Sequence, residues 1–179
     1  MNNNKNSKNK YRPPITLWFS GLPCSGKTTI AKELEGRLRK KGYSIARLDG
    51  DDIRRGLNVD LKFSKEDRKE NLRRIAHVAQ LFNDKNIIVL ASFIAPLEEN
   101  RKFLRDTIKN FNLIFVKCDI KVCSNRDIKG MYKLAREGKI KNFTGVSAPF
   151  EDPKNADIIL DTENLSVDCC VDQIIERYF

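Results

Sequence analysis

The chain has 179 residues, of which 40% are hydrophobic and 32% charged, and its formal net charge is +10 at pH 7. This length predicts one domain with a substantial core. No apolar run approaches the ~20 residues of a membrane-spanning helix, and the first residues lack the apolar segment of a secretory signal. We therefore expect a cytoplasmic protein without a membrane partner. Its five cysteines are odd in number and lack zinc-type spacing, which favours reduced thiols.

Residues 1–12 form a basic leader that is mostly Asn and Lys and contains no acidic residue. Its four basic residues carry four of the ten net charges and leave six for the rest of the chain. Such a segment has nothing to bury, so we predict that it is disordered and that residues 13–179 form a single domain. The remaining charge suits polyphosphate ligands and does not call for nucleic acid as a partner.

The first predicted elements surround a glycine-rich motif. Residues 15–19 are apolar and β-prone, as in a buried parallel strand. Next comes Gly21-Leu22-Pro23-Cys24-Ser25-Gly26-Lys27-Thr28, which fits the phosphate-binding motif G-x-x-x-x-G-K-[ST]. Ile30, Leu34 and Leu38 then recur every four residues, the stripe of an amphipathic helix. Strand, glycine loop and helix in this order predict a P-loop.

The P-loop motif assigns roles to its residues. Gly21 and Gly26 let successive N–H groups point into one concavity, to which the helix N-terminus adds partial positive charge. Lys27 is expected to reach the β- and γ-phosphates of ATP, and the Thr28 hydroxyl to ligate Mg²⁺. Cys24 lies beside a helix N-terminus and a lysine, which can lower the pKa of a thiol, although a small loop-filling residue is the simpler interpretation. The predicted ATP-binding loop comprises Gly21, Leu22, Pro23, Cys24, Ser25, Gly26, Lys27, Thr28 and Thr29.

An acidic cluster follows the second predicted strand, residues 44–48. Ligands of open α/β sheets bind at the carboxyl ends of strands, so Asp49, Asp51 and Asp52 are expected on the same rim as the P-loop. One of Asp49 and Asp51 could hold metal-bound water while the other accepts the proton of an acceptor hydroxyl. The residues alone leave open which does which. Asp51 or Asp52 could also cap a short helix at 53–57.

Two more acidic residues follow predicted strands. Asp119 comes after the fourth strand and Asp161 after the fifth, so either could also bind the metal. Asp49 and Asp51 are the stronger candidates because two carboxylates lie together there. A GTPase would carry an N-K-x-D signature, which the sequence lacks.

A long helix is predicted from Ser64 to about Asn83, with Ser64 and Asp67 as a near-match to a capping box. Its core-facing stripe turns polar toward the N-terminus, where Arg68 and Asn71 occupy it. That end of the helix either overlooks a cleft or simply reaches solvent.

The remaining pattern alternates strands with helices, which predicts an α/β fold with a parallel sheet covered by helices on both faces. Residues 126–150 depart from it, because they are basic and broken by glycines, with too little apolar content for a core element. They are interpreted as a lid over the phosphate donor, or alternatively as a solvated helical excursion. The other expected elements are strands at 86–91, 112–116 and 157–160 and helices at 98–109 and 167–178.

From about Leu17 to Asp161 the chain resembles the adenylylsulfate (APS) kinases, which are P-loop kinases. Besides the P-loop, the resemblance rests on ordered motifs at family spacing: Leu48-Asp49-Gly50-Asp51, Arg54-Arg55-Gly56-Leu57-Asn58, Phe63-Ser64-x-x-Asp67-Arg68-x-Glu70-Asn71, Arg73-Arg74-Ile75, Ser92-Phe93-Ile94, Arg126-Asp127-x-Lys129-Gly130-x-Tyr132 and Asn142-Phe143-Thr144-Gly145.

The resemblance implies transfer of the ATP γ-phosphoryl group to the 3′-hydroxyl of APS, with Mg²⁺ as cofactor and a homodimer as a possible assembly. It assigns Arg126 and Lys129 to the lid over ATP. It also implies an acceptor site of Asp51, Arg54, Phe63, Arg68, Asn71, the Ile94 backbone and Phe143, with the two phenylalanines stacked on either side of the base. Without the resemblance, Phe63 and Phe143 would be interpreted as core aromatics.

Three departures from the family pattern flank this site. Ala95 replaces a serine that has been linked to a phosphoenzyme, so direct in-line transfer is predicted. Leu97-Glu98 replaces an aromatic-Arg pair, and Ile128 replaces a proline. These changes leave open a kinase of the same fold acting on another nucleotide anhydride. A catalytically silent nucleotide- or nucleic-acid-binding protein is the third alternative, against which the intact Lys27 and Thr28 argue.

Overall fold

The computed structural model describes residues 14–179, so the predicted leader lies outside the described residues. Five parallel strands form one sheet in the order β2-β3-β1-β4-β5. The predicted fold class is confirmed, and each strand lies within two residues of its expected position. The strands are β1 (Thr16–Ser20), β2 (Ile45–Asp49), β3 (Ile88–Ser92), β4 (Phe111–Lys117) and β5 (Ile158–Asp161).

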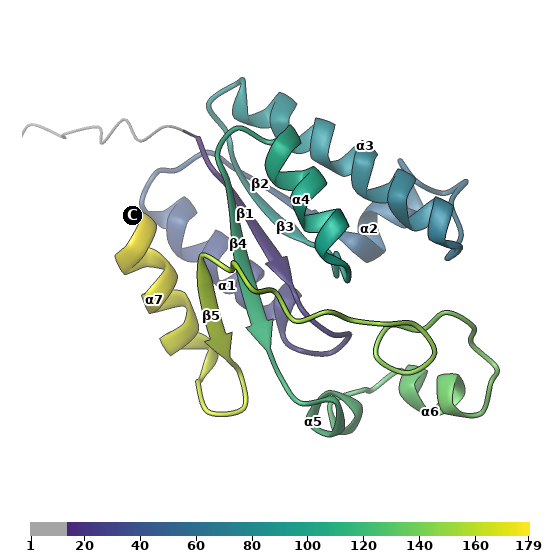
Figure 1. Ribbon diagram of the computed structural model, residues 1–179. Coiled ribbons are helices and arrows are strands. Elements are labelled where there is room, and N and C mark those ends of the chain that lie inside the picture. Colours follow the sequence, from purple (N-terminus) through teal and green to yellow (C-terminus); the bar gives the residue numbers. More distant parts are fainter. Residues whose placement is uncertain (1–13) are drawn as a thin grey trace, which may run out of the picture.

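Helices cover both faces of the sheet (Figure 1). On one face, α1 (Lys27–Lys40) and α7 (Val167–Tyr178) pack over a core that includes Leu17, Phe19 and Val116. On the other, α3 (Lys65–Asn83) and α4 (Glu98–Thr107) enclose a second core around the fully buried Trp18. Alternate residues of β1 therefore enter different cores, as the period of a strand requires.

Hydroxyl and carboxylate side chains cap several of the helices. Ser64 accepts a hydrogen bond from the N–H of Asp67 at 3.0 Å, as predicted for the start of α3. The short helix α2 (Gly50–Arg55) begins one residue after β2, and its cap is Asp49. The expectation that Asp51 or Asp52 caps this helix is wrong, because the helix starts earlier than its apolar residues indicated.

Residues 118–148 contain a third, small core that the composition did not reveal. Cys118, Cys123 and Tyr132 are buried there, with Leu22 and Phe143 packed against them. The expectation that the basic segment lacks core residues is therefore wrong at Tyr132, which is 1% exposed and donates from its hydroxyl to the carbonyl of Pro23 at 3.0 Å. This contact holds the segment beside the P-loop. Its helices are α5 (Ile120–Asn125) and α6 (Met131–Arg136).

No helix within residues 14–179 is both long enough and apolar enough to span a bilayer. All five cysteines are free thiols. His77 lies on the solvent side of α3, away from the sheet.

Candidate active site

The P-loop joins β1 to α1 at the carboxyl edge of the sheet. Gly21 has a φ of 150°, and a Cβ there would lie 2.4 Å from the carbonyl oxygen of Val116, so only glycine fits. Gly26, with a φ of 104°, occupies the N-cap position of α1. A strand, a glycine loop and a helix N-terminus thus meet here, an arrangement whose backbone amides can form a phosphate-binding cradle.

The ammonium group of Lys27 lies over this cradle. Its Nζ donates to the carbonyl oxygens of Gly21 at 3.0 Å and Leu22 at 2.5 Å. Burial disfavours the charged form and lowers the pKa of Lys27 to about 8. If a phosphate group took the place of these carbonyls beside Lys27, its negative charge would favour the ammonium form and raise the pKa of Lys27.

This shift predicts how ATP affinity depends on pH. Below about pH 8 the free protein already carries the Lys27 ammonium, so the Kd for ATP should not change through this group. Above it, binding must take up a proton, and the Kd should rise by up to about tenfold per pH unit. Calorimetric titration with a non-hydrolysable ATP analogue from pH 7 to 9.5 measures this. The Lys27→Ala variant is the control, and an equal rise in that variant would exclude Lys27 as the cause.

Thr28 and Asp49 form an oxygen pair beside the P-loop. The Thr28 hydroxyl donates to Oδ2 of Asp49 at 2.7 Å, and Asp49 is 9% exposed. Its other oxygen accepts from the N–H of Asp51, which fixes the carboxylate. A hydroxyl and a carboxylate suit Mg²⁺, which takes few protein ligands in kinases and relies on substrate phosphates and water for the rest. These two residues fit the predicted metal site.

The two other acidic candidates, Asp119 and Asp161, form hydrogen bonds with residues next to them in the chain. Asp119 caps α5 through the N–H of Lys121, and Asp161 accepts from Glu163 and Asn164. Neither is hydrogen-bonded to Thr28, whereas Asp49 is.

Asp51 occupies a different environment from Asp49. It is exposed at the start of α2, and its Oδ2 accepts from Nζ of Lys129 at 2.9 Å. Lys129 belongs to the basic segment, so this ion pair joins the acidic rim to the predicted lid. The two acids therefore differ in environment: Asp49 is buried and faces Thr28, whereas Asp51 is exposed and faces Lys129.

A cavity of about 480 Å³ adjoins the P-loop on the side of α7. The guanidinium of Arg126 borders it and donates to the side chain and carbonyl of Thr162 at 3.2 and 2.7 Å. Thr162 in turn donates to the carbonyl of Ser25 at 3.0 Å. The position of this cavity beside the P-loop is suited to the nucleoside part of ATP. No sequence pattern pointed to Thr162, whose contacts depend on β5 lying next to β4.

Cys24 lies at the mouth of the P-loop with a φ of 62°. Burial and the neighbouring carboxylate of Asp127 raise the pKa of its thiol, and Lys27 only partly offsets them. The direction of this shift agrees with the simpler interpretation of Cys24 as a small loop residue, and not with the alternative of a lowered pKa. The exposed Thr29 lines the same cavity as Cys24 and Arg126.

Across the cleft, one exposed aromatic ring is flanked by two guanidinium groups. Phe63 is 57% exposed, so its interpretation as a core residue is wrong. The guanidinium carbons of Arg54 and Arg68 lie 4.4 and 5.8 Å from its ring centre. Burial lowers the pKa of both arginines, and Arg54 lowers that of Arg68 further. Two cations held this close favour an anionic ligand.

Arg68 also spans the cleft to the basic segment. It donates to the Thr144 hydroxyl at 2.9 Å and to the carbonyl of Asn142. Phe143, between these two residues, packs edge-on against Tyr132 with ring centres 5.0 Å apart. It is partly buried against the small core.

The polar end of the α3 stripe faces the interior. Asn71 is 6% exposed and accepts from the amide of Asn58 at 3.0 Å, so the solvent alternative is wrong for it. Ile94 is partly buried, and its carbonyl accepts from the Ser20 hydroxyl at the end of β1. These backbone and amide groups lie at the same edge of the sheet as the P-loop.

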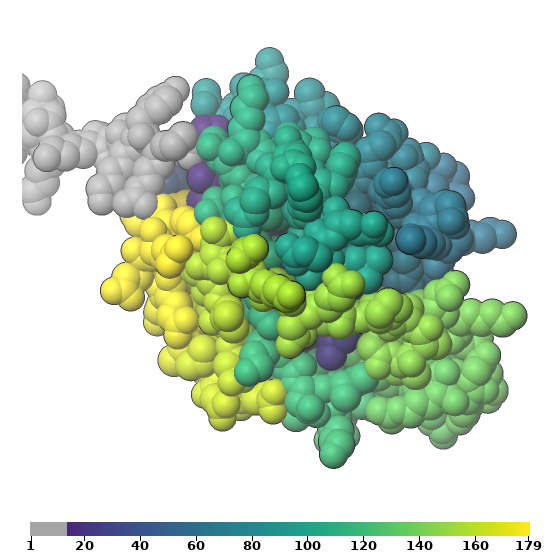
Figure 2. All heavy atoms as spheres, in the orientation of Figure 1, coloured from purple at the N-terminus to yellow at the C-terminus, as the bar shows by residue number. Residues whose placement is uncertain are grey.

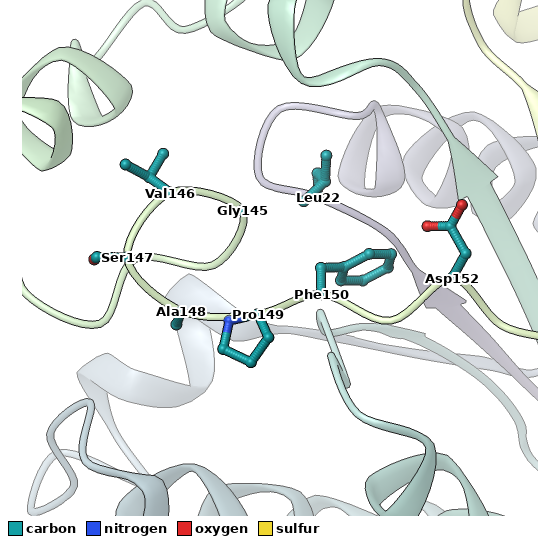
Figure 3. Close-up of a pocket in the computed structure, with 8 residues that line it drawn as sticks. All are labelled: Leu22, Gly145, Val146, Ser147, Ala148, Pro149, Phe150 and Asp152. Carbon is teal, nitrogen blue, oxygen red and sulfur yellow. The ribbon is translucent and has the colours of Figure 1, made fainter.

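A second cavity of about 490 Å³ opens between the P-loop and residues 145–152 (Figure 3). Leu22 points into it from one side, and Phe150 and Asp152 border it from the other. In the space-filling view, atoms in the purple of β1 and the P-loop are visible at the bottom of a hollow in this region (Figure 2). Part of the P-loop therefore borders this cavity.

Residues 13–161 match the sequence model of the adenylylsulphate kinase family. The chain belongs to this family. It is 46% identical to a probable adenylyl-sulfate kinase of Bacillus subtilis over 94% of its length and 86% of the relative. It is 48% identical to an adenylyl-sulfate kinase of Clostridium acetobutylicum over 89% of its length and 80% of that protein.

A solved structure agrees with the family assignment. The APS kinase of Mycobacterium tuberculosis, solved with AMPPNP and APS, superposes with a TM-score of 0.88 at 42% identity. The match covers 92% of this chain and 96% of that one. The likeness to a shikimate kinase of Aquifex aeolicus, at 16% identity and a TM-score of 0.51, extends only to the fold. The adenylylsulphate kinase family predicted from the sequence motifs is thereby confirmed.

Proposed function

We propose that the chain transfers the γ-phosphoryl group of ATP to the 3′-hydroxyl of APS, giving 3′-phosphoadenylylsulfate and ADP. The observation that supports this proposal is the presence of two distinct groups of residues, one suited to a phosphate donor and one to an anionic nucleotide acceptor. The P-loop with its Thr28–Asp49 pair lies on one side. Phe63 with its flanking arginines lies on the other. Asp51 stands between them at the start of α2.

On the donor side, the loop amides and Lys27 would hold the phosphates of ATP, and Arg126 would border the nucleoside. Thr28 and Asp49 would hold Mg²⁺, which supplies positive charge at the phosphates when bound. Within residues 14–179, no side chain of the proposed acceptor site is hydrogen-bonded to these donor-side groups. The P-loop lies between β1 and α1, Asp49 ends β2, and Arg126 is held by Thr162.

On the acceptor side, Asp51 is proposed as the base. Its carboxylate accepts the proton of the 3′-hydroxyl while that oxygen attacks the γ-phosphorus, and the bond from this phosphorus to the β–γ bridging oxygen breaks to release ADP. Asp49 is less suited to this role, since Thr28 and the α2 backbone occupy both of its oxygens.

Transfer is proposed to be direct, without a phosphoenzyme. Ala95, at the position of the family serine, has no hydroxyl and is 1% exposed within the core beneath α3 and α4. Its carbonyl accepts from the buried Arg101 at 3.0 Å, which holds the backbone at this point. No enzyme nucleophile is needed when the γ-phosphoryl group of ATP and the hydroxyl of the acceptor are bound next to each other.

The acceptor would be held by Arg54 and Arg68 through its phosphosulfate, by Phe63 and Phe143 through its base, and by Asn71 and the Ile94 backbone. Phe63→Ala should therefore raise the KM for APS by at least about tenfold, because stacking a base on an aromatic ring contributes about 1–3 kcal/mol. The KM for ATP should stay within about twofold. Steady-state assays with each substrate varied measure both values. Similar increases for both substrates would remove Phe63 from the acceptor site.

A second candidate is a kinase of the same fold acting on another nucleotide anhydride, which the substitutions Ala95 and Leu97-Glu98 near the site favour. A coupled assay for ADP release with APS and a panel of other nucleotides distinguishes the two. We expect the highest kcat/KM with APS. A higher value with another nucleotide would replace APS as the acceptor while leaving the donor site as described.

The reaction is proposed to take place in the cytosol, where the five free thiols stay reduced. The small-molecule partners are then ATP and APS. A homodimer remains a possible assembly.

A further inference from the structure

A loop beside the acceptor site is held by polar contacts instead of an apolar anchor. It covers residues 57–62, between α2 and α3, and its side chains Leu57 and Val59 are 51% and 72% exposed. Asn58, between them, is fully buried. Because the apolar side chains point to solvent, the loop depends on hydrogen bonds to stay against α3.

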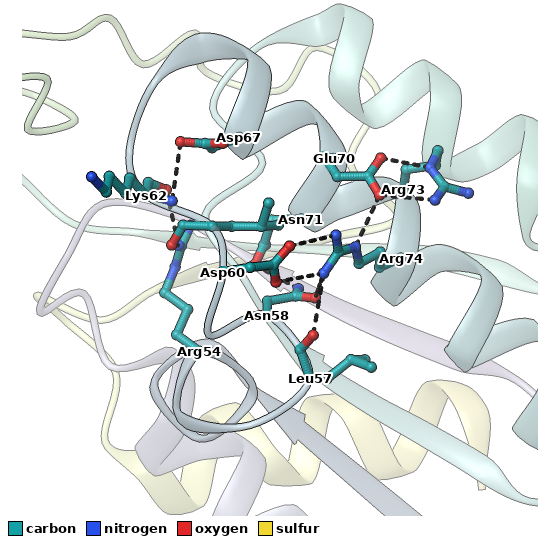
Figure 4. A network of polar contacts seen from close by, with 11 residues as sticks. Arg54, Leu57, Asn58, Asp60, Lys62, Asp67, Glu70, Asn71, Arg73 and Arg74 are labelled. Carbon is teal, nitrogen blue, oxygen red and sulfur yellow. Dashed lines mark hydrogen bonds and ion pairs between the residues drawn. The ribbon is translucent and has the colours of Figure 1, made fainter.

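Arg74 of α3 supplies a large share of these bonds (Figure 4). Its guanidinium donates to both carboxylate oxygens of Asp60 at 2.8 Å. The same group reaches the carbonyl of Leu57 at 3.2 Å and Oδ1 of Asn58 at 3.3 Å. A bidentate arginine–carboxylate pair has a defined geometry, so Arg74 fixes where the loop lies.

The contact to Asn58 also determines how that amide is oriented. A guanidinium only donates, so Oδ1 of Asn58 must face Arg74 and its Nδ2 must face away. This Nδ2 donates to Oδ1 of Asn71 at 3.0 Å. The amide nitrogen of Asn71 is thereby turned outward, and it makes no hydrogen bond to another part of residues 14–179 although Asn71 is 6% exposed. Among residues 14–179 this nitrogen is not one of the fully buried polar atoms that lack a partner, so it reaches the surface, where a ligand can accept its hydrogen bond.

Asn71 lies one turn after Arg68 on the same side of α3, and Arg68 crosses the cleft to Asn142 and Thr144. We propose that Arg74 is a positioning residue which, through Asn58, makes Asn71 present an N–H donor to the acceptor nucleotide. This inference rests on the proposed function, which places Asn71 in the acceptor site. The atom that Asn71 recognises must then be an acceptor, such as a ring nitrogen or an oxyanion.

Asn58→Asp tests the direction of this relay. The substitution keeps the shape of the side chain and the bond to Arg74, but its second oxygen cannot donate to Asn71. Asn71 must then turn its own amide nitrogen inward and present an oxygen to the acceptor. We expect the KM for APS to rise about tenfold or more, the effect of losing one hydrogen bond and gaining an opposed oxygen. The KM for ATP and the melting temperature should stay near wild type. An unchanged KM for APS would overturn the proposal.

Arg74→Met and Arg73→Met form a matched pair on the same helix. Both arginines bind Glu70, at 2.9 and 2.7 Å, but only Arg74 reaches the loop. Arg74→Met should raise the KM for APS several-fold with little change in that for ATP, and Arg73→Met should change neither. Equal effects of the two substitutions would contradict the relay. If Asn58→Asp does not fold, this pair decides, because both arginines are partly exposed and their removal leaves the core intact.

The test separates this inference from the proposed function. If the wild-type chain phosphorylates APS but Asn58→Asp and Arg74→Met behave as wild type, the relay is wrong and the function stands. If the wild-type chain prefers another nucleotide, the same variants are compared on that acceptor, whose KM must then show the same selective rise.

Discussion

Lys27→Ala is expected to lower kcat by at least about 10²–10³, the usual effect of removing a preorganised charge at the transferring phosphoryl group. Lys27 is the ammonium group that lies over the P-loop cradle, 3.0 Å from the carbonyl of Gly21. Its lowered pKa, about 8, means that the fold itself disfavours the charge. Its removal is therefore expected to affect turnover more than stability. Single-turnover rates at saturating ATP and acceptor measure the loss.

Lys32→Ala is the matched control, since Lys32 lies on the same helix but is exposed. It should leave kcat unchanged, and both variants should melt close to the wild-type temperature. A Lys27→Ala variant that turns over at a near wild-type rate would refute the role given to Lys27. A variant that loses activity together with its fold would show instead that Lys27 is structural.

Asp51→Asn should lower kcat by about 10²–10⁴, the range that general-base catalysis contributes. The substitution keeps the size of the side chain and removes its ability to take a proton from the 3′-hydroxyl. Because Asp51 is exposed and its one ion pair is with Lys129, the fold should not change. The KM values for both substrates should move much less than kcat, and steady-state kinetics report both.

Asp52→Asn is the control for Asp51, since Asp52 is the next residue of α2 and pairs only with Arg55 on the same helix. It should keep nearly full activity. If Asp51→Asn remains active while Asp49→Asn does not, the assignment of base and metal-linked residue must be exchanged. If both remain active, neither acid takes part in the chemistry.

The parts of the site that the sequence predicted depend either on neighbouring residues or on the general geometry of a parallel sheet. The P-loop is a continuous motif between a strand and a helix, so the cradle and Lys27 followed from spacing alone. The Thr28–Asp49 pair could be expected because parallel strands bring their carboxyl ends to one edge. The helix cap at Ser64 likewise depends only on the next three residues.

The parts that the sequence did not reveal depend on contacts between distant segments. Tyr132 is one aromatic residue in a basic stretch, and it is buried because Pro23 and Cys123 meet it from elsewhere in the chain. The predicted cap of α2 was wrong for a different reason. The first turn of this helix, Gly50-Asp51-Asp52, is polar, so no apolar pattern marked where the helix begins. The link from Asn58 to Asn71 joins residues 13 positions apart, and no periodic pattern predicts it.

The central claim is that the γ-phosphate of ATP and the 3′-hydroxyl of APS meet between Lys27 and Asp51. A crystal structure of the chain with Mg²⁺, a non-hydrolysable ATP analogue and APS measures this directly. We expect the terminal phosphate within hydrogen-bonding distance of Lys27 and the loop amides, with the 3′-hydroxyl between the γ-phosphorus and Asp51. A nucleotide bound away from the P-loop, or APS bound with its 3′-hydroxyl turned away from Asp51, would contradict it.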